Sequence, residues 1–196
     1  MIRGSDNGPV PNPPGAAALP GGPYPIGLAG LLVTVGMLFA AFSAALLMRR
    51  GGTDWIRVAL PPIVWGNTAL LLASSGAVEL ARRAVRRDAL PALGSWLALA
   101  ALLGVLFLAG QVAAWRMLAA QGVLLPTSPH AAFFYMLSAV HGAHVVGGLG
   151  ALGWTLRRAM AGAYTSGRQT GLTHAAIYWH VVGGVWVYLL TILSIL

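Results

Sequence analysis

Two apolar stretches near the carboxyl end decide the fold: residues 128–158, SPHAAFFYMLSAVHGAHVVGGLGALGWTLRR, and residues 172–196, LTHAAIYWHVVGGVWVYLLTILSIL. Each is long enough to cross a bilayer as a helix, which takes about 20 mostly apolar residues. Together they hold all five histidines of the chain. Because a polar ring is costly at membrane depth, such a residue faces a neighbouring helix, a cofactor, a lipid headgroup or a cavity. We therefore expect the function to lie inside a membrane.

The composition of the whole chain agrees with a membrane location. Hydrophobic residues make up 58% of the 196 residues and charged residues 8%, and the mean hydropathy is +0.77. A soluble domain carries about a quarter charged residues. The net charge of +8 comes from arginines in short groups near segment ends, so membrane topology explains it better than nucleic-acid binding. Cysteine is absent, which excludes disulfides and thiolate metal sites.

The apolar pattern divides the chain into a tail and a membrane domain. Residues 1–24 are rich in proline and glycine and contain no apolar run, so we expect a flexible polar tail without a cleavable signal. Residues 25–196 then predict an all-α integral membrane bundle of five transmembrane helices, with no soluble domain. The expected spans are 25–48, 59–83, 91–117, 130–156 and 172–196.

The distribution of arginines predicts the orientation. With five crossings, the side of the tail carries eight arginines: Arg3, Arg82, Arg83, Arg86, Arg87, Arg157, Arg158 and Arg168. The opposite side carries four: Arg49, Arg50, Arg57 and Arg116. Because cytoplasmic loops carry the excess of positive charge, we expect a cytoplasmic N-terminus and a periplasmic or extracellular C-terminus in a bacterial cytoplasmic (inner) membrane.

One carboxylate, Glu79, falls near the end of an expected span. Arg82 and Arg83 follow it by three and four residues, so they lie on the same helix face. The spacing predicts an ion pair at the inner membrane interface. A proton-relay role for Glu79 is the weaker alternative.

The histidine spacing argues against a haem or metal in this chain. His130 and His144 are 14 residues apart, which spans about 21 Å of helix and suits two stacked haems if another helix carries a matching pair. His174 and His180 are only six apart. A site made from His141, His144 and His180 is geometrically possible, but no Asp, Glu or Cys lies nearby in sequence to complete it. We expect no metal and no cofactor here.

Catalysis by this chain alone is not expected either. The carboxylates are Asp6, Asp54, Glu79 and Asp88, three of them in the tail or in loops. They form no dyad, and the sequence offers no nucleophile with an adjacent base and no phosphate-binding loop followed by lysine.

A resemblance emerges from the motifs of the last two spans. The stretches FFYMLSAVHGAHVVGGLGALGWTLRR and AAIYWHVVGGVWVYLL resemble the last two helices of subunit III of haem–copper oxidases. The similarity covers residues 25–196, and His141–Gly142–x–His144 with Trp179–His180 and Trp186 carries it most specifically. The length is similar to that of the short five-helix bacterial members.

This resemblance implies an accessory subunit without haem or copper of its own. Such a subunit lies beside the catalytic subunit I and is expected to contact subunit II as well. The haem and copper are bound by these partner subunits. It binds phospholipid, stabilises subunit I and supports proton uptake during oxygen reduction in aerobic respiration. For contact with lipid or a neighbouring subunit, the hypothesis names His141, His144, His180, Arg157, Trp179 and Trp186.

The chain departs from the family pattern at three acidic positions. Val35, Ala114 and Gly183 stand where the family usually has a carboxylate. Functions of those carboxylates do not transfer to this chain, which indicates a divergent branch. Alternatives are an accessory subunit of a nitric oxide reductase, a haem-binding membrane cytochrome, and a transporter, although five dissimilar spans show no internal repeat.

Overall fold

The computed structural model describes residues 23–165, 167 and 169–196, which form five α-helices. These are α1 (Pro23–Arg49), α2 (Ile63–Arg86), α3 (Leu90–Ala120), α4 (Pro129–Met160) and α5 (Thr170–Ile195). All five are long and apolar enough to cross a membrane. The predicted all-α bundle of five transmembrane helices is confirmed. Residues 1–22 of the expected polar tail lie outside the described residues.

The ends of the helices follow from local chemistry. The second span was expected from residue 59, but α2 begins at Ile63 because Pro61 and Pro62 precede it. Their carbonyls accept hydrogen bonds from the first amides of the helix, at 3.0 and 3.1 Å. Proline supplies no amide donor, which costs least at a helix start. At α4, the hydroxyl of Ser128 caps the helix by accepting from the amide of Ala131 at 3.1 Å.

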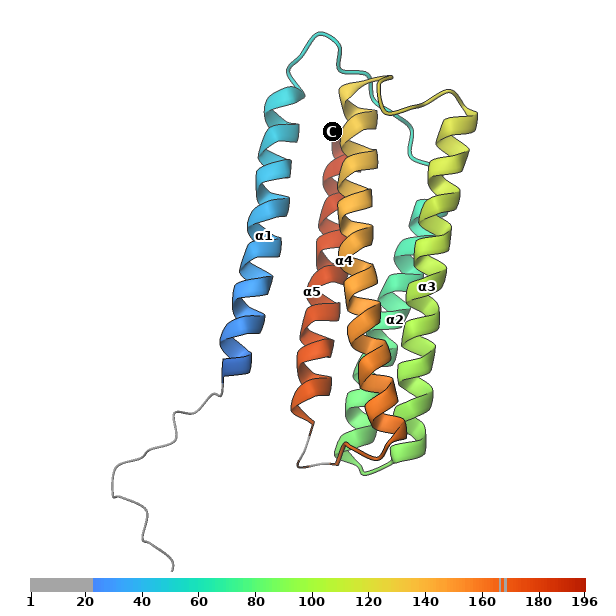
Figure 1. Cartoon of the computed structure of the whole chain (residues 1–196). Helices are drawn as coiled ribbons and strands as arrows, with labels where there is room; N and C mark the ends of the chain where they lie inside the picture. Colours follow the sequence, from blue (N-terminus) through green and yellow to red (C-terminus); the bar gives the residue numbers. More distant parts are fainter. Residues whose placement is uncertain (1–22, 166, 168) are drawn as a thin grey trace, which may run out of the picture.

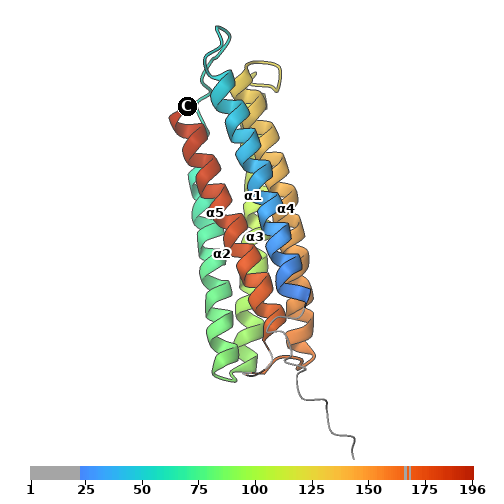
Figure 2. The same cartoon turned by 90° about the vertical axis from the view of Figure 1, so that its left-hand side faces the viewer.

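Helices α2 to α5 form an antiparallel four-helix bundle, and α1 lies against one side of it (Figures 1 and 2). Among the described residues, α1 packs against α4 and α5, whereas α2 packs against α3 and α5. The start of α1, the α2–α3 turn and the α4–α5 loop share one end of the bundle, and the C-terminus lies at the other (Figure 1). We call the first the tail end and the second the opposite end.

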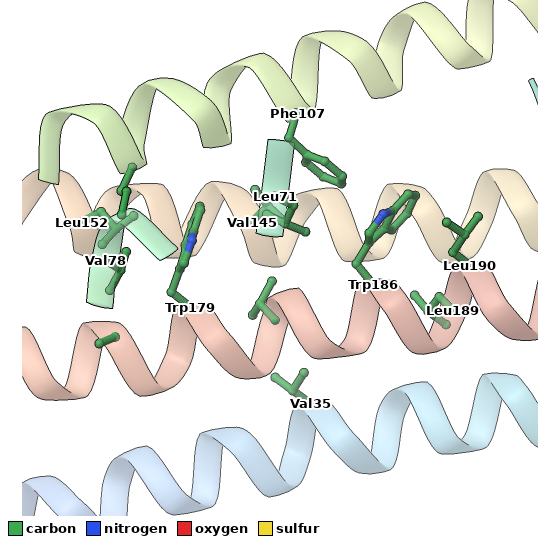
Figure 3. Packing of buried hydrophobic residues seen from close by; sticks show 14 of the residues in the cluster. Val35, Leu71, Val78, Phe107, Val145, Leu152, Trp179, Trp186, Leu189 and Leu190 are labelled. Atoms are coloured by element: carbon green, nitrogen blue, oxygen red, sulfur yellow. The ribbon is translucent and has the colours of Figure 1, made fainter. Parts of the chain in front are cut away.

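Large aromatic side chains fill the centre of the bundle. Trp179 and Trp186 of α5 point toward α3 and α4, whereas Val35 of α1 approaches α5 from its other side (Figure 3). Both indoles are 1% exposed. The aromatic side chains of α5 therefore fill the core that α5 shares with α2, α3 and α4. Helix α1 makes a smaller contact on the outer side of α5.

Candidate functional site

Trp179 joins all four helices of the bundle. Its indole Nε1 donates to the Ser74 hydroxyl of α2 at 3.0 Å, and that hydroxyl donates to the carbonyl of Ala100 in α3 at 2.8 Å. The ring fits between two glycines: a Cβ at Gly104 of α3 or Gly148 of α4 would come within 2.8 Å of it. Gly148 thus lets the backbone of α4 come close to the Trp179 ring.

Trp186 and His141 form a second junction nearer the opposite end. The indole Nε1 of Trp186 donates to the Thr68 hydroxyl of α2 at 3.0 Å. The imidazole of His141 stacks on this indole, with 5.1 Å between ring centroids and 28° between planes. Phe107 and Phe39 meet the imidazole edge-on at 5.9 and 6.3 Å. His141 is therefore an interior residue, 1% exposed.

His144, one turn further along α4, also faces Phe39 of α1. Its ring centroid lies 5.5 Å from that of Phe39 in α1, and its Nδ1 lies 2.8 Å from the carbonyl of Val140. The Tyr178 hydroxyl of α5 donates to the backbone carbonyl of His144 at 3.1 Å. This residue therefore helps to fix α1 and α5 on α4.

His180 lies on a different side of α5, near the C-terminal turns of α2, which carry Glu79. Glu79 and Arg82 both act electrostatically on its ring. The Glu79 carboxylate contacts Arg82 at 3.0 Å and Arg83 at 3.8 Å, as the i,i+3 and i,i+4 spacings suggested. All three charged side chains are partly exposed, so the cluster sits near the tail end of the bundle rather than in its core.

Arg157 is exposed on the last turns of α4, 13 residues beyond His144 on the same helix. The structure therefore does not gather His141, His144, His180 and Arg157 into one site. Among the described residues, no three histidine or acidic side chains lie close enough to share a metal ion. Whether these residues contact lipid or a partner stays a prediction.

An apolar groove lies between α1, α4 and α5 toward the tail end. It has a volume of about 370 Å³. The lining residues are Leu28 and Leu31 of α1, Gly147, Ala151, Trp154 and Thr155 of α4, and Gly171, His174, Ala175 and Tyr178 of α5. Sequence reasoning missed this groove, although the small residues at four-residue spacing in α4 were a usable signal. Arg158, seven residues after Ala151 and three after Thr155, lies on the same face of α4, closer to the tail end than the groove.

A polar junction at the opposite end was also missed. Arg57 and Trp55, from the extended segment before α2, donate to the carbonyl of Leu196 at 2.7 and 3.3 Å, and Arg57 also donates to Ile195. His130 accepts from the Val58 amide at 3.2 Å, while its other ring nitrogen lies 3.1 Å from the carbonyl of Leu193. His130 is therefore held by protein groups.

Comparison with known proteins matches residues 28–195 to the family model of cytochrome c oxidase subunit III. The chain belongs to the cytochrome c oxidase subunit III family. The cytochrome c oxidase subunit 3 of Thermostichus vulcanus is 33% identical over 180 residues, 87% of this chain and 86% of the relative. That of Alkalihalophilus pseudofirmus is 30% identical over 195 residues, 95% of this chain and 93% of the relative. The probable cytochrome c oxidase subunit 3 of Mycobacterium bovis is 32% identical over 126 residues, 64% of this chain and 62% of the relative.

The three positions where this subunit III lacks the expected acids are buried. Val35 is 3% exposed and Ala114 is fully buried. A Cβ at Gly183 would lie 3.4 Å from the Ser75 hydroxyl of α2, so little space is left for a larger side chain. A carboxylate at any of them would require a partner inside the bundle. Apolar residues at these positions remove that requirement.

Proposed function

We propose that this chain is a non-catalytic subunit of a haem–copper terminal oxidase. In this role it stabilises subunit I, binds phospholipid and supports proton uptake through subunit I. The observation that carries the lipid part of the proposal is the apolar groove between α1, α4 and α5, which lies toward the same end of the bundle as Arg157 and Arg158 of α4. A groove of this kind fits an acyl chain and a phosphate headgroup.

The groove supports a specific arrangement of the lipid. Leu28, Leu31 and Ala151 supply apolar walls, while His174 and the exposed Trp154 lie on its rim. Arg157 and Arg158 follow within one turn of Trp154. We propose that the acyl chain fills the groove and that the phosphate meets the arginines, whose guanidinium groups pair well with phosphate.

The proposed orientation places the tail end on the cytoplasmic side of a bacterial inner membrane. Of the described arginines, six lie toward this end: Arg82, Arg83, Arg86, Arg87, Arg157 and Arg158. Four lie toward the opposite end: Arg49, Arg50, Arg57 and Arg116. The bias follows the positive-inside rule. It also sets the phosphate site at the cytoplasmic leaflet.

Purification in mild detergent through an affinity tag tests the oxidase assignment. We expect haem–copper subunit I, and with it subunit II, to copurify and to carry the visible absorbance. The chain stripped from these subunits should be colourless. Haem retained by the isolated chain would overturn the proposal in favour of a cytochrome.

The lipid assignment needs variants in the same complex. Ala151→Phe fills the groove, and Arg157→Gln with Arg158→Gln removes the proposed phosphate partners. Both changes should lower the amount of copurifying phospholipid, measured by mass spectrometry. They should also shorten the time for which the oxidase stays active during repeated turnover. Leu102→Phe on the exposed surface of α3 is the control. If the Ala151→Phe variant and the arginine variant both copurify as much phospholipid as the parent, the lipid assignment is refuted. The proposed membership in the oxidase would not be affected.

A further inference from the structure

Three buried polar side chains from three helices carry polar atoms that have no protein partner. They are Asn67 of α2, Gln111 of α3 and His141 of α4, which are 2%, 2% and 1% exposed. The atoms concerned are Nδ2 of Asn67, Nε2 and Oε1 of Gln111, and Nδ1 and Nε2 of His141. We call these three residues the polar layer.

Contacts with neighbouring residues place the α2 and α3 members of the polar layer at one level. A Cβ built on Gly110 of α3 would fall inside contact distance of the Asn67 amide, so the amide lies against the backbone beside Gln111. Thr68, which follows Asn67, is bonded to Trp186. Trp186 in turn stacks on His141.

The α3–α4 packing brings His141 to the same level as Gln111. Phe107, one turn before Gln111, lies 5.9 Å from His141 between ring centroids. Trp115, one turn after Gln111, donates to the hydroxyl of Ser138 at 3.0 Å. Because α3 and α4 run antiparallel, Gln111 falls between the heights of His141 and Ser138. The polar layer therefore lies near the contact between Trp186 and Phe107, two side chains that Figure 3 shows between α5 and α3.

Leaving these atoms unpaired would be costly. A buried donor or acceptor without a partner costs about 1 to 3 kcal/mol, and no bulk water reaches a helix bundle at membrane depth to relieve it. The two amides and the imidazole together offer both donors and acceptors. Such a mixed set matches water, which typically makes about three hydrogen bonds to buried polar groups.

We propose that the polar layer binds a small cluster of internal water molecules that bridges α2, α3 and α4. Each water accepts hydrogen bonds from the N–H groups of the amides. Each imidazole nitrogen donates to a water or accepts from one, according to the tautomer. The ligand set contains no carboxylate, and the described residues hold no group of three metal-ligating side chains at this level, so a neutral ligand fits better than a cation.

The bridged water explains why polar residues are kept in an otherwise apolar core. A sliding of α3 along α4 by one turn would leave the amide of Gln111 opposite apolar side chains such as Leu137 or Val145, which line the same core. The hydrogen-bonded layer therefore favours one register of the helices. This role does not depend on lipid binding in the groove between α1, α4 and α5.

The first test is a cryo-EM map of the full chain purified with its accompanying subunits, at a resolution that shows ordered water. We expect density for at least one water within hydrogen-bond distance of two members of the polar layer. Side chains of the layer bonded directly to one another would overturn the proposal. A layer without density between its members would overturn it as well.

The second test uses the thermal midpoint of the detergent-purified chain. If Gln111 holds bridging water, Gln111→Leu removes the partners of that water and lowers the midpoint. If its amide is dry and unpaired, the same change removes a buried polar group and raises the midpoint, which would contradict the proposal. Gln121→Leu, an exposed site at the end of the same helix, is the matched control and should leave the midpoint unchanged.

Discussion

The close fit of Trp179 between two glycines predicts a large difference between neighbouring glycine-to-alanine changes in α4. At Gly148 a Cβ would lie 2.8 Å from Cε3 of Trp179 and 2.9 Å from Cζ3, whereas at Gly150 it would meet nothing within 4 Å. Both changes gain up to about 1 kcal/mol of helix propensity. Only Gly148→Ala adds the strain of overpacking, about 1 to 3 kcal/mol.

The two variants should therefore differ by that strain. We expect Gly150→Ala to raise the free energy of unfolding slightly, and Gly148→Ala to fall below it by about 1 to 3 kcal/mol. The indole cannot move away freely, because its Nε1 is bonded to Ser74 and its far edge is 2.8 Å from a Cβ position at Gly104. Unfolding by a denaturing detergent in mixed micelles, followed by tryptophan fluorescence, measures both free energies.

A third variant makes the prediction sharper. Trp179→Leu leaves more room on the α4 side, so Gly148→Ala should cost less in that background than in the parent chain. The difference between the two costs is the coupling energy of the pair. Equal stabilities for the Gly148→Ala and Gly150→Ala variants would refute the packing described for Trp179.

Three further predictions follow from other contacts. Arg57→Gln removes the donors to the carbonyls of Leu196 and Ile195, so backbone amides in the last turn of α5 should exchange hydrogen faster by mass spectrometry; unchanged exchange would show that these bonds do not hold the turn. Thr68→Val removes the acceptor of the Trp186 indole and should cost about 1 kcal/mol in the same unfolding assay, and a stability equal to the parent would contradict that bond. Glu79→Gln breaks a partly exposed ion pair, so it should cost only about 0.2 to 1 kcal/mol; a larger loss would indicate a buried role for Glu79.

Much of the fold is predictable from the sequence because it depends on local properties. Length and apolarity of each segment determine that it spans the bilayer as a helix. The start of α2 after Pro62 and the Ser128 cap of α4 follow from neighbouring residues. The contact of Glu79 with Arg82 also depends on one helical turn. Each of these features can be read without knowing which helices are neighbours.

The roles of the polar residues in α2 and α3 could not be predicted in the same way. Ser74 and Thr68 carry no motif, and their hydrogen bonds to other helices join residues that are 26 to 118 positions apart in sequence. The groove likewise depends on how far α1 stands from α4 and α5. Such features require the packing of several helices at once.

The sequence by itself determined a membrane bundle of five helices whose last two spans carry the histidines. Only the tertiary structure decided what each histidine does. Residues three apart share a helix face, yet that face is wide enough to meet two neighbours. Both histidines meet Phe39 of α1, but His141 also stacks on Trp186 in the core, while His144 lies closer to Phe39. Helical periodicity relates the directions of two side chains, but the arrangement of the other helices determines what lies in each direction.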